Sequence, residues 1–211
     1  MDKLLEISEM LQKGRAKGVV KLVKEALEEG VSAADILNNG LLAGMNIVGD
    51  KFKKEEVFVP EVLVAARAMS KGIEELTPYL QAGDTNKLGK AVIGTVKGDL
   101  HDIGKNLVKI MLEGKGIDVI DLGTDVTAER FIETAKTENV DIICCSALLT
   151  TTMDEMEKVV KLVKAENLDV KVMIGGAPVN QEFCDAIGAD YYTDDAATAS
   201  DVAKAILEGK K

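Results

Sequence analysis

From Lys90 onward, short apolar runs alternate with amphipathic segments of helical periodicity, and this alternation restricts the fold more than any other feature. The expected strands are residues 91–96, 118–121, 142–145, 170–174 and 190–192, and the expected helices are about 104–115, 127–138, 152–167, 180–187 and 196–208. Continuously apolar strands separated by helices are typical of a parallel sheet covered on both faces. We therefore predict a Rossmann/flavodoxin-like α/β domain with a five-stranded parallel sheet over residues 88–211.

The N-terminal part shows helical spacing and no strand pattern. Two periodic segments cover about residues 4–11 and 19–27, and Ser32 is a plausible N-cap for a third. Pro60 opens a fourth segment as a first-turn proline. About four helices without strands indicate a small bundle, predicted over residues 1–83. Residues 81–86 are interpreted as a linker and a hinge between the two domains.

Length and charge narrow the class of protein. The chain has 211 residues, a net charge of −10 and 3% aromatic residues, so it has room for two modest domains. The acidic balance and the lack of a basic run argue against nucleic acid or an anionic membrane as partners. The sequence has no signal-peptide pattern and no run approaching the about 20 apolar residues of a membrane span, so we expect a cytoplasmic protein.

The cysteines and the single histidine limit the metal sites that the chain could build. Cys144, Cys145 and Cys184 show no Cys-x-x-Cys spacing, so neither a disulfide framework nor a zinc site is encoded. The adjacent pair is expected to point to opposite faces of a strand. If the one histidine, His101, binds a metal ion, most other ligands have to come from a cofactor.

His101 lies in the glycine-bounded turn Gly98–Gly104, directly after the first expected strand. Asp99 stands two residues earlier, and a carboxylate that accepts the second ring N–H orients and tunes a metal-bound imidazole. An axial metal ligand is therefore one interpretation of this turn. An incidental surface histidine is the other, and the Asp-x-His-x-x-Gly spacing alone does not decide between them.

Two further loops follow the third and fourth expected strands, at residues 146–152 and 175–178. In a sheet of order 2-1-3-4-5 these loops and the His101 turn lie side by side at the carboxyl edge, where open α/β sheets bind ligands. Simpler explanations exist for each loop. Gly175-Gly176 can form an ordinary turn, and Thr152 with Glu155 fits a helix capping box.

Familiar nucleotide sites do not fit the spacing. Five residues separate Gly98 from Gly104, where a phosphate-binding loop has four, and Asn106 stands where such a loop has Ser or Thr. No Gly-x-Gly-x-x-Gly is present for a dinucleotide, and Cys145-Ser146 stand where a phosphoacceptor receiver domain has an aspartate. We therefore do not expect a nucleoside triphosphatase, a dinucleotide-binding enzyme or a receiver domain.

Three motifs taken together resemble a known family. The segment from Thr95 to Asn106, the Ser146-x-Leu148 element and the Gly175-Gly176 pair resemble the Asp-x-His-x-x-Gly, Ser-x-Leu and Gly-Gly signature of cobalamin-binding domains. Residues 44–50 and 58–62 look like the helical cap that precedes the cobalamin domain of methionine synthase. The resemblance covers nearly the whole chain. A pair of these modules without a catalytic barrel is similar to the corrinoid proteins of methyltransferase systems that use methanol, methylamines, betaines or aryl methyl ethers.

The resemblance implies a role for each matching residue. His101 matches the cobalt ligand, Asp99 its hydrogen-bonding carboxylate, and Thr152 the hydroxyl that completes a proton relay. The remaining matches are implied cofactor contacts: Gly98, Leu100, Asp102 and Gly104 around the ring, Ser146, Leu148, Thr150, Gly175 and Gly176 along the nucleotide tail, Ala196 near its end, and Phe58 over the cobalt-bound methyl group.

The implied function is that of a corrinoid methyl carrier, which is a component of an enzyme system without a substrate pocket of its own. It would accept a methyl group on cob(I)alamin from a cognate substrate:corrinoid methyltransferase, and deliver it from methylcob(III)alamin to a second methyltransferase acting on tetrahydrofolate or a thiol. A reductive activation protein is a further implied partner. The alternatives are the cobalamin subunit of an adenosylcobalamin-dependent mutase, which the helical cap disfavours, and a cobalamin-based sensor, which the acidic charge and the missing helix-turn-helix disfavour. A purely structural or protein-binding module remains the simplest alternative.

Overall fold

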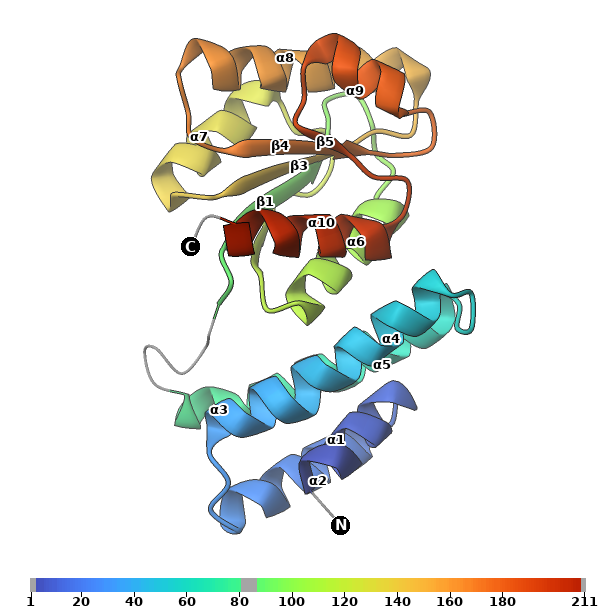
Figure 1. Ribbon diagram of the computed structural model, residues 1–211, viewed down its shortest axis with the longest axis vertical. Coiled ribbons are helices and arrows are strands. Elements are labelled where there is room, and N and C mark those ends of the chain that lie inside the picture. The colour runs from blue at the N-terminus through green and yellow to red at the C-terminus, as the bar shows by residue number, and fades with distance from the viewer. Residues whose placement is uncertain (1–2, 81–86, 210–211) are drawn as a thin grey trace. The chain divides into compact units, whose positions relative to one another are not determined.

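The computed structural model describes residues 3–80 and 87–209. The chain divides into two compact units, one formed by the helical N-terminal region and one that contains the sheet, from Leu88 onward (Figure 1). Residues 81–86, interpreted above as a linker and hinge, lie outside the described residues. In the described parts of the chain, no helix is both long and apolar enough to cross a membrane.

The first unit is built from the helices that the apolar periodicity predicts. Ser32 Oγ accepts the backbone N–H of Asp35 at 3.0 Å, which confirms the N-cap, and Pro60 lies in the first turn of the last long helix. An unexpected feature is a π-helical segment in which Gly40 faces Ile7, so that a Cβ at position 40 would come within 3.2 Å of the Ile7 side chain. The elements of this unit are α1 (Lys3–Gln12), α2 (Ala16–Glu28), α3 (Ala33–Asp35), η1 (Ile36–Leu42), α4 (Ala43–Lys53), α5 (Val59–Leu76) and η2 (Thr77–Tyr79).

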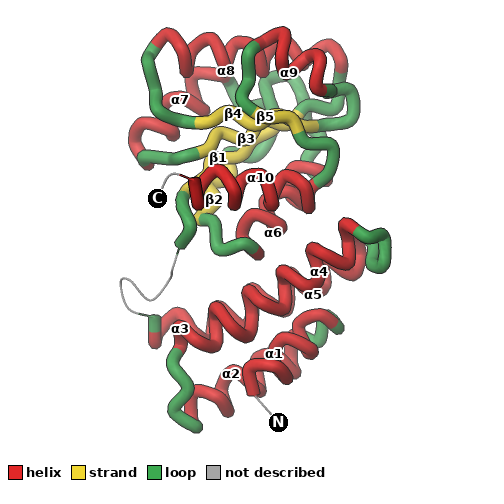
Figure 2. The backbone as a smooth tube through the Cα atoms, viewed as in Figure 1, coloured by secondary structure: helices red, strands yellow, loops and turns green. Residues whose placement is uncertain are grey.

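The second unit contains a five-stranded, all-parallel sheet in the order β2-β1-β3-β4-β5, which confirms the expected order (Figure 2). Its strands are β1 (Lys90–Thr95), β2 (Asp118–Asp121), β3 (Ile142–Ser146), β4 (Lys171–Gly175) and β5 (Tyr191–Tyr192). The helical elements that follow them are α6 (Ile103–Gly114), α7 (Ala128–Glu138), η3 (Thr150–Thr152), α8 (Met153–Ala165), α9 (Gln181–Ile187) and α10 (Ala196–Gly209).

Helices cover both faces of this sheet, α7, α8 and α9 on one side and α6 and α10 on the other (Figure 1). Because successive strand residues point to opposite faces, Cys145 packs in the first of these two cores and Cys144 in the second, as expected. Most strand ends differ from the expected ends by one residue, and the others agree. Val96, for example, follows β1 as a single parallel bridge to Val126. The chain leaves the ladder there and begins the His101 turn.

Candidate functional site

The turn that carries His101 occupies the carboxyl end of β1, immediately before α6. The Asp99 N–H donates to the carbonyl of Val96 at 3.1 Å, which closes a tight turn. Gly98 has a φ of +81°, a left-handed conformation that costs an L side chain energy. The glycine therefore lets the chain reverse direction directly after the strand and brings Asp99 back toward β3.

The carboxylate of Asp99 is fully buried and accepts hydrogen bonds from two segments of the chain. Its Oδ1 accepts the backbone N–H of His101 at 3.1 Å and lies 2.7 Å from Nδ1 of the same residue. Its Oδ2 accepts from the loop that follows β3: the N–H of Leu148 at 2.7 Å, the N–H of Leu149 at 3.1 Å and the hydroxyl of Thr152 at 3.1 Å. Asp99 thus fastens the His101 turn to the loop that follows β3.

These bonds determine the charge of Asp99 and the tautomer of His101. Burial alone raises the pKa of this carboxyl, but the N–H donors of Leu148, His101 and Leu149 and the imidazole outweigh it and hold the pKa well below its usual range. An ionised carboxylate only accepts hydrogen bonds, so Nδ1 of His101 carries the proton in this pair. Nε2 of the neutral ring is left with its lone pair available to a metal.

The ring of His101 is exposed over about half of its surface, with 51% of the side chain accessible, although its anchor is buried. Exposed apolar side chains flank it in sequence and across the Asp99 contact: Leu100, Ile103, Leu148 and Leu149, which are 74%, 77%, 43% and 40% exposed. Isolated exposed leucines are ordinary, but four exposed apolar side chains in two loops that Asp99 joins indicate a ligand or partner surface beside His101.

Thr152 does not cap α8, so the capping-box interpretation with Glu155 is wrong. Thr152 makes no side-chain bond to the first turn of the helix, and its backbone has helical ψ rather than the extended conformation of an N-cap. The hydroxyl instead lies 3.1 Å from Asp99 Oδ2 and 2.9 Å from the carbonyl of Leu149. Tertiary contact with the buried carboxylate decides its orientation.

The glycine pair after β4 brings the loop at residues 175–178 against the loop that follows β3, at residues 146–152. The N–H of Ala147 donates to the carbonyl of Gly175 at 3.2 Å. Gly176 has a φ of +130°, and a Cβ there would lie 1.8 Å from the carbonyl oxygen of Ala147, so a side chain has no room. The two loops therefore touch through their backbones.

The other predicted site residues divide by location. Asp102 turns away to accept the side-chain N–H of Asn106 at 3.1 Å, and Gly104 lies in the first turn of α6. Ser146 ends β3 beside Gly175, with Thr150 exposed in η3. Ala196 is buried at the start of α10. Phe58 is 64% exposed before α5 in the helical unit, where its N–H donates to Glu61 at 3.0 Å.

Sequence reasoning missed two residues that support the turn, one at the end of β1 and one in the loop that follows β2. Thr95 donates its hydroxyl to the carbonyl of His101 at 2.8 Å, and Asp125 accepts the N–H of Gly98 at 2.7 Å. Thr95 begins the segment that resembles the family signature, and Asp125 lies outside every matching motif, but the sequence analysis assigned a role to neither residue. No local signal in the sequence joins Asp125 to the turn.

Comparison with known proteins places this site in a family. Two family models described as B12 binding domain match the chain, one over residues 89–202 and one over residues 4–77. Dimethylamine corrinoid protein 1 of Methanosarcina mazei is 44% identical, covering 98% of this chain and 97% of that protein. A corrinoid protein of Desulfitobacterium hafniense is 39% identical, with 98% of each covered.

Solved structures agree with the sequence matches. The crystal structure of the methanol:cobalamin methyltransferase complex MtaBC from Methanosarcina barkeri aligns with a TM-score of 0.92 at 31% identity, covering 98% of this chain and 80% of that one. A cobalamin-binding protein from Desulfitobacterium hafniense aligns with a TM-score of 0.79 at 31% identity, covering 98% of each. The chain therefore belongs to the family of B12-binding corrinoid proteins.

Proposed function

We propose that the protein carries a methyl group on a corrinoid whose cobalt is bound by Nε2 of His101. A methyltransferase that binds the methylated substrate loads the carrier, and a second methyltransferase removes the methyl group to tetrahydrofolate or a thiol, with a reductive activation protein restoring the cofactor. When bound, the corrinoid would supply the cobalt that accepts and releases the methyl group, with its other ligands. Names of the relatives support this class, since they refer to dimethylamine corrinoid proteins and to a methanol:cobalamin methyltransferase complex.

The observation that carries the proposal is the 2.7 Å contact between Nδ1 of His101 and Oδ1 of Asp99. A carboxylate that binds one ring nitrogen fixes the tautomer, fixes the ring plane and makes the other nitrogen a better ligand. One protein ligand is sufficient because the corrinoid brings the others. A chain with a single histidine is therefore able to hold cobalt.

The residues around the ring fit such a cofactor. The exposed side chains of Leu100, Ile103, Leu148 and Leu149 offer an apolar rim to a flat macrocycle. Gly104 has an ordinary φ, and a Cβ at this position would meet no atom of the protein within 4 Å. The polypeptide itself gives no reason for glycine there. A bound group that approaches the first turn of α6 does.

Asp99 and Thr152 would orient the imidazole of His101 and hold the proton on its Nδ1. While Nε2 is bound to a metal, Asp99 fixes Nδ1–H from the buried side. Without a bound metal, Nε2 of the half-exposed ring would be accessible to solvent. Asp99 stays ionised throughout because its remaining donors persist. Thr152 keeps Oδ2 hydrogen-bonded, and we propose that its hydroxyl supports the relay.

The other predicted contacts remain part of the proposal. Ser146, Thr150, Gly175 and Gly176 are proposed to line the nucleotide tail, with Ala196 near its end. Phe58, exposed in the helical unit, is proposed to contact the cofactor on its methyl-bearing side. Domain limits of 1–83 and 88–211 are proposed for the helical cap and the cobalamin-binding domain.

The single histidine makes a specific test possible. Untagged protein labelled with 15N-histidine is loaded with hydroxocobalamin and reduced to the cob(II) form, and the electron paramagnetic resonance spectrum is recorded. Because His101 is the one histidine of the chain, a change from the three-line splitting of 14N to the two-line splitting of 15N identifies it as a cobalt ligand. His101→Ala is the matched control and is expected to lose the label-dependent splitting. If the splitting of the wild type is the same with 14N- and 15N-histidine, His101 is not the cobalt ligand.

Transfer is tested separately. The reduced holoprotein, incubated with a cognate methyltransferase and its methylated substrate, is expected to give the visible spectrum of methylcobalamin. A carbon-skeleton rearrangement in place of methylation would favour the mutase instead.

A further inference from the structure

The turn that carries His101 is held from a second direction by residues outside the Asp-x-His-x-x-Gly motif. Asp125, in the loop between β2 and α7, accepts the N–H of Gly98 at 2.7 Å through Oδ1. Its own N–H donates to the carbonyl of Asp99 at 3.0 Å. One residue thus binds the backbone on both sides of the Gly98–Asp99 peptide. The position of the Asp99 carboxylate depends on this clamp.

Asp125 makes these bonds in an unfavourable backbone conformation. Its φ is +56°, in the left-handed region that residues other than glycine rarely adopt. Aspartate and asparagine tolerate this region better than other side chains do. A non-glycine residue kept there points to a use for its side chain, and the bond to Gly98 is that use.

Thr95 completes the support from the end of β1. The residue is fully buried, and its hydroxyl donates to the carbonyl of His101 at 2.8 Å. Its backbone N–H donates to the carbonyl of Gly123 at 2.9 Å, and its carbonyl accepts the N–H of Val126 at 3.0 Å. Thr95 therefore ties the backbone of His101 to the same loop that contains Asp125.

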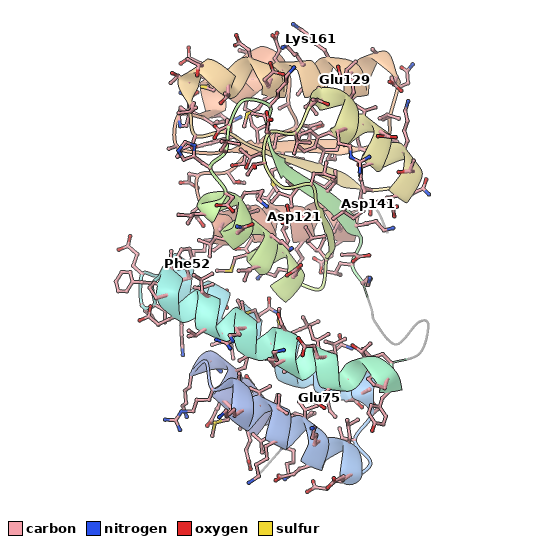
Figure 3. The ribbon with its side chains drawn as sticks, turned by 180° about the vertical axis from the view of Figure 1, so that it is seen from behind. Phe52, Glu75, Asp121, Glu129, Asp141 and Lys161 are labelled. Atoms are coloured by element: carbon pink, nitrogen blue, oxygen red, sulfur yellow. The ribbon has the colours of Figure 1, made fainter. Side chains whose placement is uncertain are left out.

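The loop is itself anchored, so it acts as a fixed support. Asp121, at the end of β2 (Figure 3), accepts the ammonium of Lys105 at 2.5 Å and the N–H of Gly123 at 2.9 Å. The side chain of Lys105, on α6, is 2% exposed and that of Asp121 is 22% exposed, so the ion pair is shielded from solvent on the lysine side. The first turns of the helix that follows His101 and the loop that holds the turn are thereby joined.

We propose that Asp125 and Thr95 are positioning residues for the cobalt ligand, fixing the backbone at Gly98–Asp99 and at His101 so that the imidazole is preset toward the cofactor. This inference rests on the proposed ligation by His101. The Asp99 bonds fix the ring, whereas Thr95 and Asp125 fix the backbone from which the ring projects. A metal ligand must be held within roughly 0.5 Å and 10–20° of its working geometry, so both sets of contacts count.

Conservative substitutions at Thr95 separate the hydroxyl from the volume. Thr95→Val keeps the shape and removes the donor, and Thr95→Ser keeps the donor. In the 15N-histidine cob(II) experiment, we expect Thr95→Val to lower the ratio of histidine-bound to histidine-free cobalt about fivefold, as one lost neutral hydrogen bond does. Thr95→Ser is expected to restore the wild-type splitting. Ser200→Ala is the control, because it removes a buried hydroxyl that donates to the carbonyl of Ala197 within α10.

Substitutions at Asp125 separate the acceptor from the backbone conformation. Asp125→Asn keeps an acceptor oxygen and tolerates a positive φ, so it is expected to retain the wild-type splitting. Asp125→Gly accepts the φ without strain but removes the acceptor, and is expected to lower the histidine-bound fraction. Asp190→Ala is the control, since it removes a carboxylate that accepts the N–H of Val172 at 2.8 Å beside β4. Unfolding curves of every apo variant identify effects on stability alone.

The outcomes distinguish this inference from the proposed function. If Thr95→Val and Asp125→Gly bind cobalamin with the wild-type splitting while His101→Ala loses it, the positioning role is overturned and the ligation stands. If His101→Ala keeps the splitting, the ligation itself fails. If Asp125→Gly does not fold, Thr95→Val and Thr95→Ser are compared. The wild-type splitting in both variants overturns the positioning role, whereas loss of the splitting in Thr95→Val alone supports it.

Discussion

Nδ1 of His101 lies 2.7 Å from Oδ1 of Asp99. The carboxylate is fully buried, whereas 51% of the histidine side chain is accessible to solvent. One end of the imidazole is therefore fixed by the protein, and the other faces outward with a free lone pair. A ligand held in this way has one tautomer and little freedom to rotate.

Replacing Asp99 by asparagine is expected to destabilise the apoprotein by about 3 kcal/mol near pH 7, because an amide cannot accept from all the N–H and O–H donors that surround it. The pKa of Asp99 lies below its unfolded value, so its contribution is complete well above pH ~4 and decreases as the pH falls below that value. Urea unfolding of both proteins at several pH values measures the difference. The difference in unfolding free energy between the two proteins should become smaller in acid. A difference independent of pH would contradict the ionised state, and Asp102→Asn, at an exposed aspartate, is the control.

Replacing Thr152 by valine is expected to cost about 1 kcal/mol of stability, the usual value of one neutral hydrogen bond, and Thr152→Ser should cost less. Its hydroxyl has one proton for two acceptors, Asp99 Oδ2 and the carbonyl of Leu149. A thermodynamic cycle with Asp99→Asn tests which acceptor matters. Additive effects of the two substitutions would mean that the hydroxyl serves the Leu149 carbonyl alone.

Replacing Gly176 by alanine is expected to destabilise the protein by more than about 3 kcal/mol or to prevent folding. The added Cβ would lie 1.8 Å from the carbonyl oxygen of Ala147, and the φ of +130° is itself unfavourable for alanine. Thermal unfolding measures this effect. A variant as stable as the wild type would show that the two loops can separate.

Replacing Gly104 by alanine is expected to have the opposite effect on the apoprotein. Its Cβ would meet nothing within 4 Å, and alanine favours the helix over glycine, so stability should stay equal or rise by up to about 1 kcal/mol. Cobalamin affinity, measured by titration, should fall because the side chain of the introduced alanine occupies space that the cofactor needs. Unchanged affinity would remove Gly104 from the proposed contacts.

The cysteine thiols are expected to be unreactive in the native protein. Burial raises the pKa of Cys144 to about 12, and it raises the pKa of Cys145 as well, so little thiolate is present at neutral pH. Thiolate is the nucleophile in thiol chemistry, and these side chains therefore do not compete as methyl acceptors. A colorimetric thiol reagent at pH 8 should react slowly with the native protein and fully after unfolding. A fast reaction in the native state would show that the strand opens.

Local patterns in the sequence were sufficient for most of the fold and for the centre of the site. The alternation of apolar strands and amphipathic helices predicted the parallel sheet, since both periodicities follow from backbone geometry. Asp99 and His101 were paired correctly because two residues in one tight turn lie close together in any fold. Ser32 was recognised as an N-cap for the same reason.

Contacts between distant segments needed the tertiary structure. Thr152 matched a capping box, but its hydroxyl turns to Asp99, which lies 53 positions away in the chain. Asp125 gave no signal at all, although it holds the backbone at Gly98. By itself the sequence determined the elements and their order, because these depend on local geometry and periodicity, and its motifs singled out the histidine that we propose as ligand. Only the tertiary structure decided what holds that histidine in place, because a buried carboxylate takes the donors that folding brings to it, wherever they stand in the sequence.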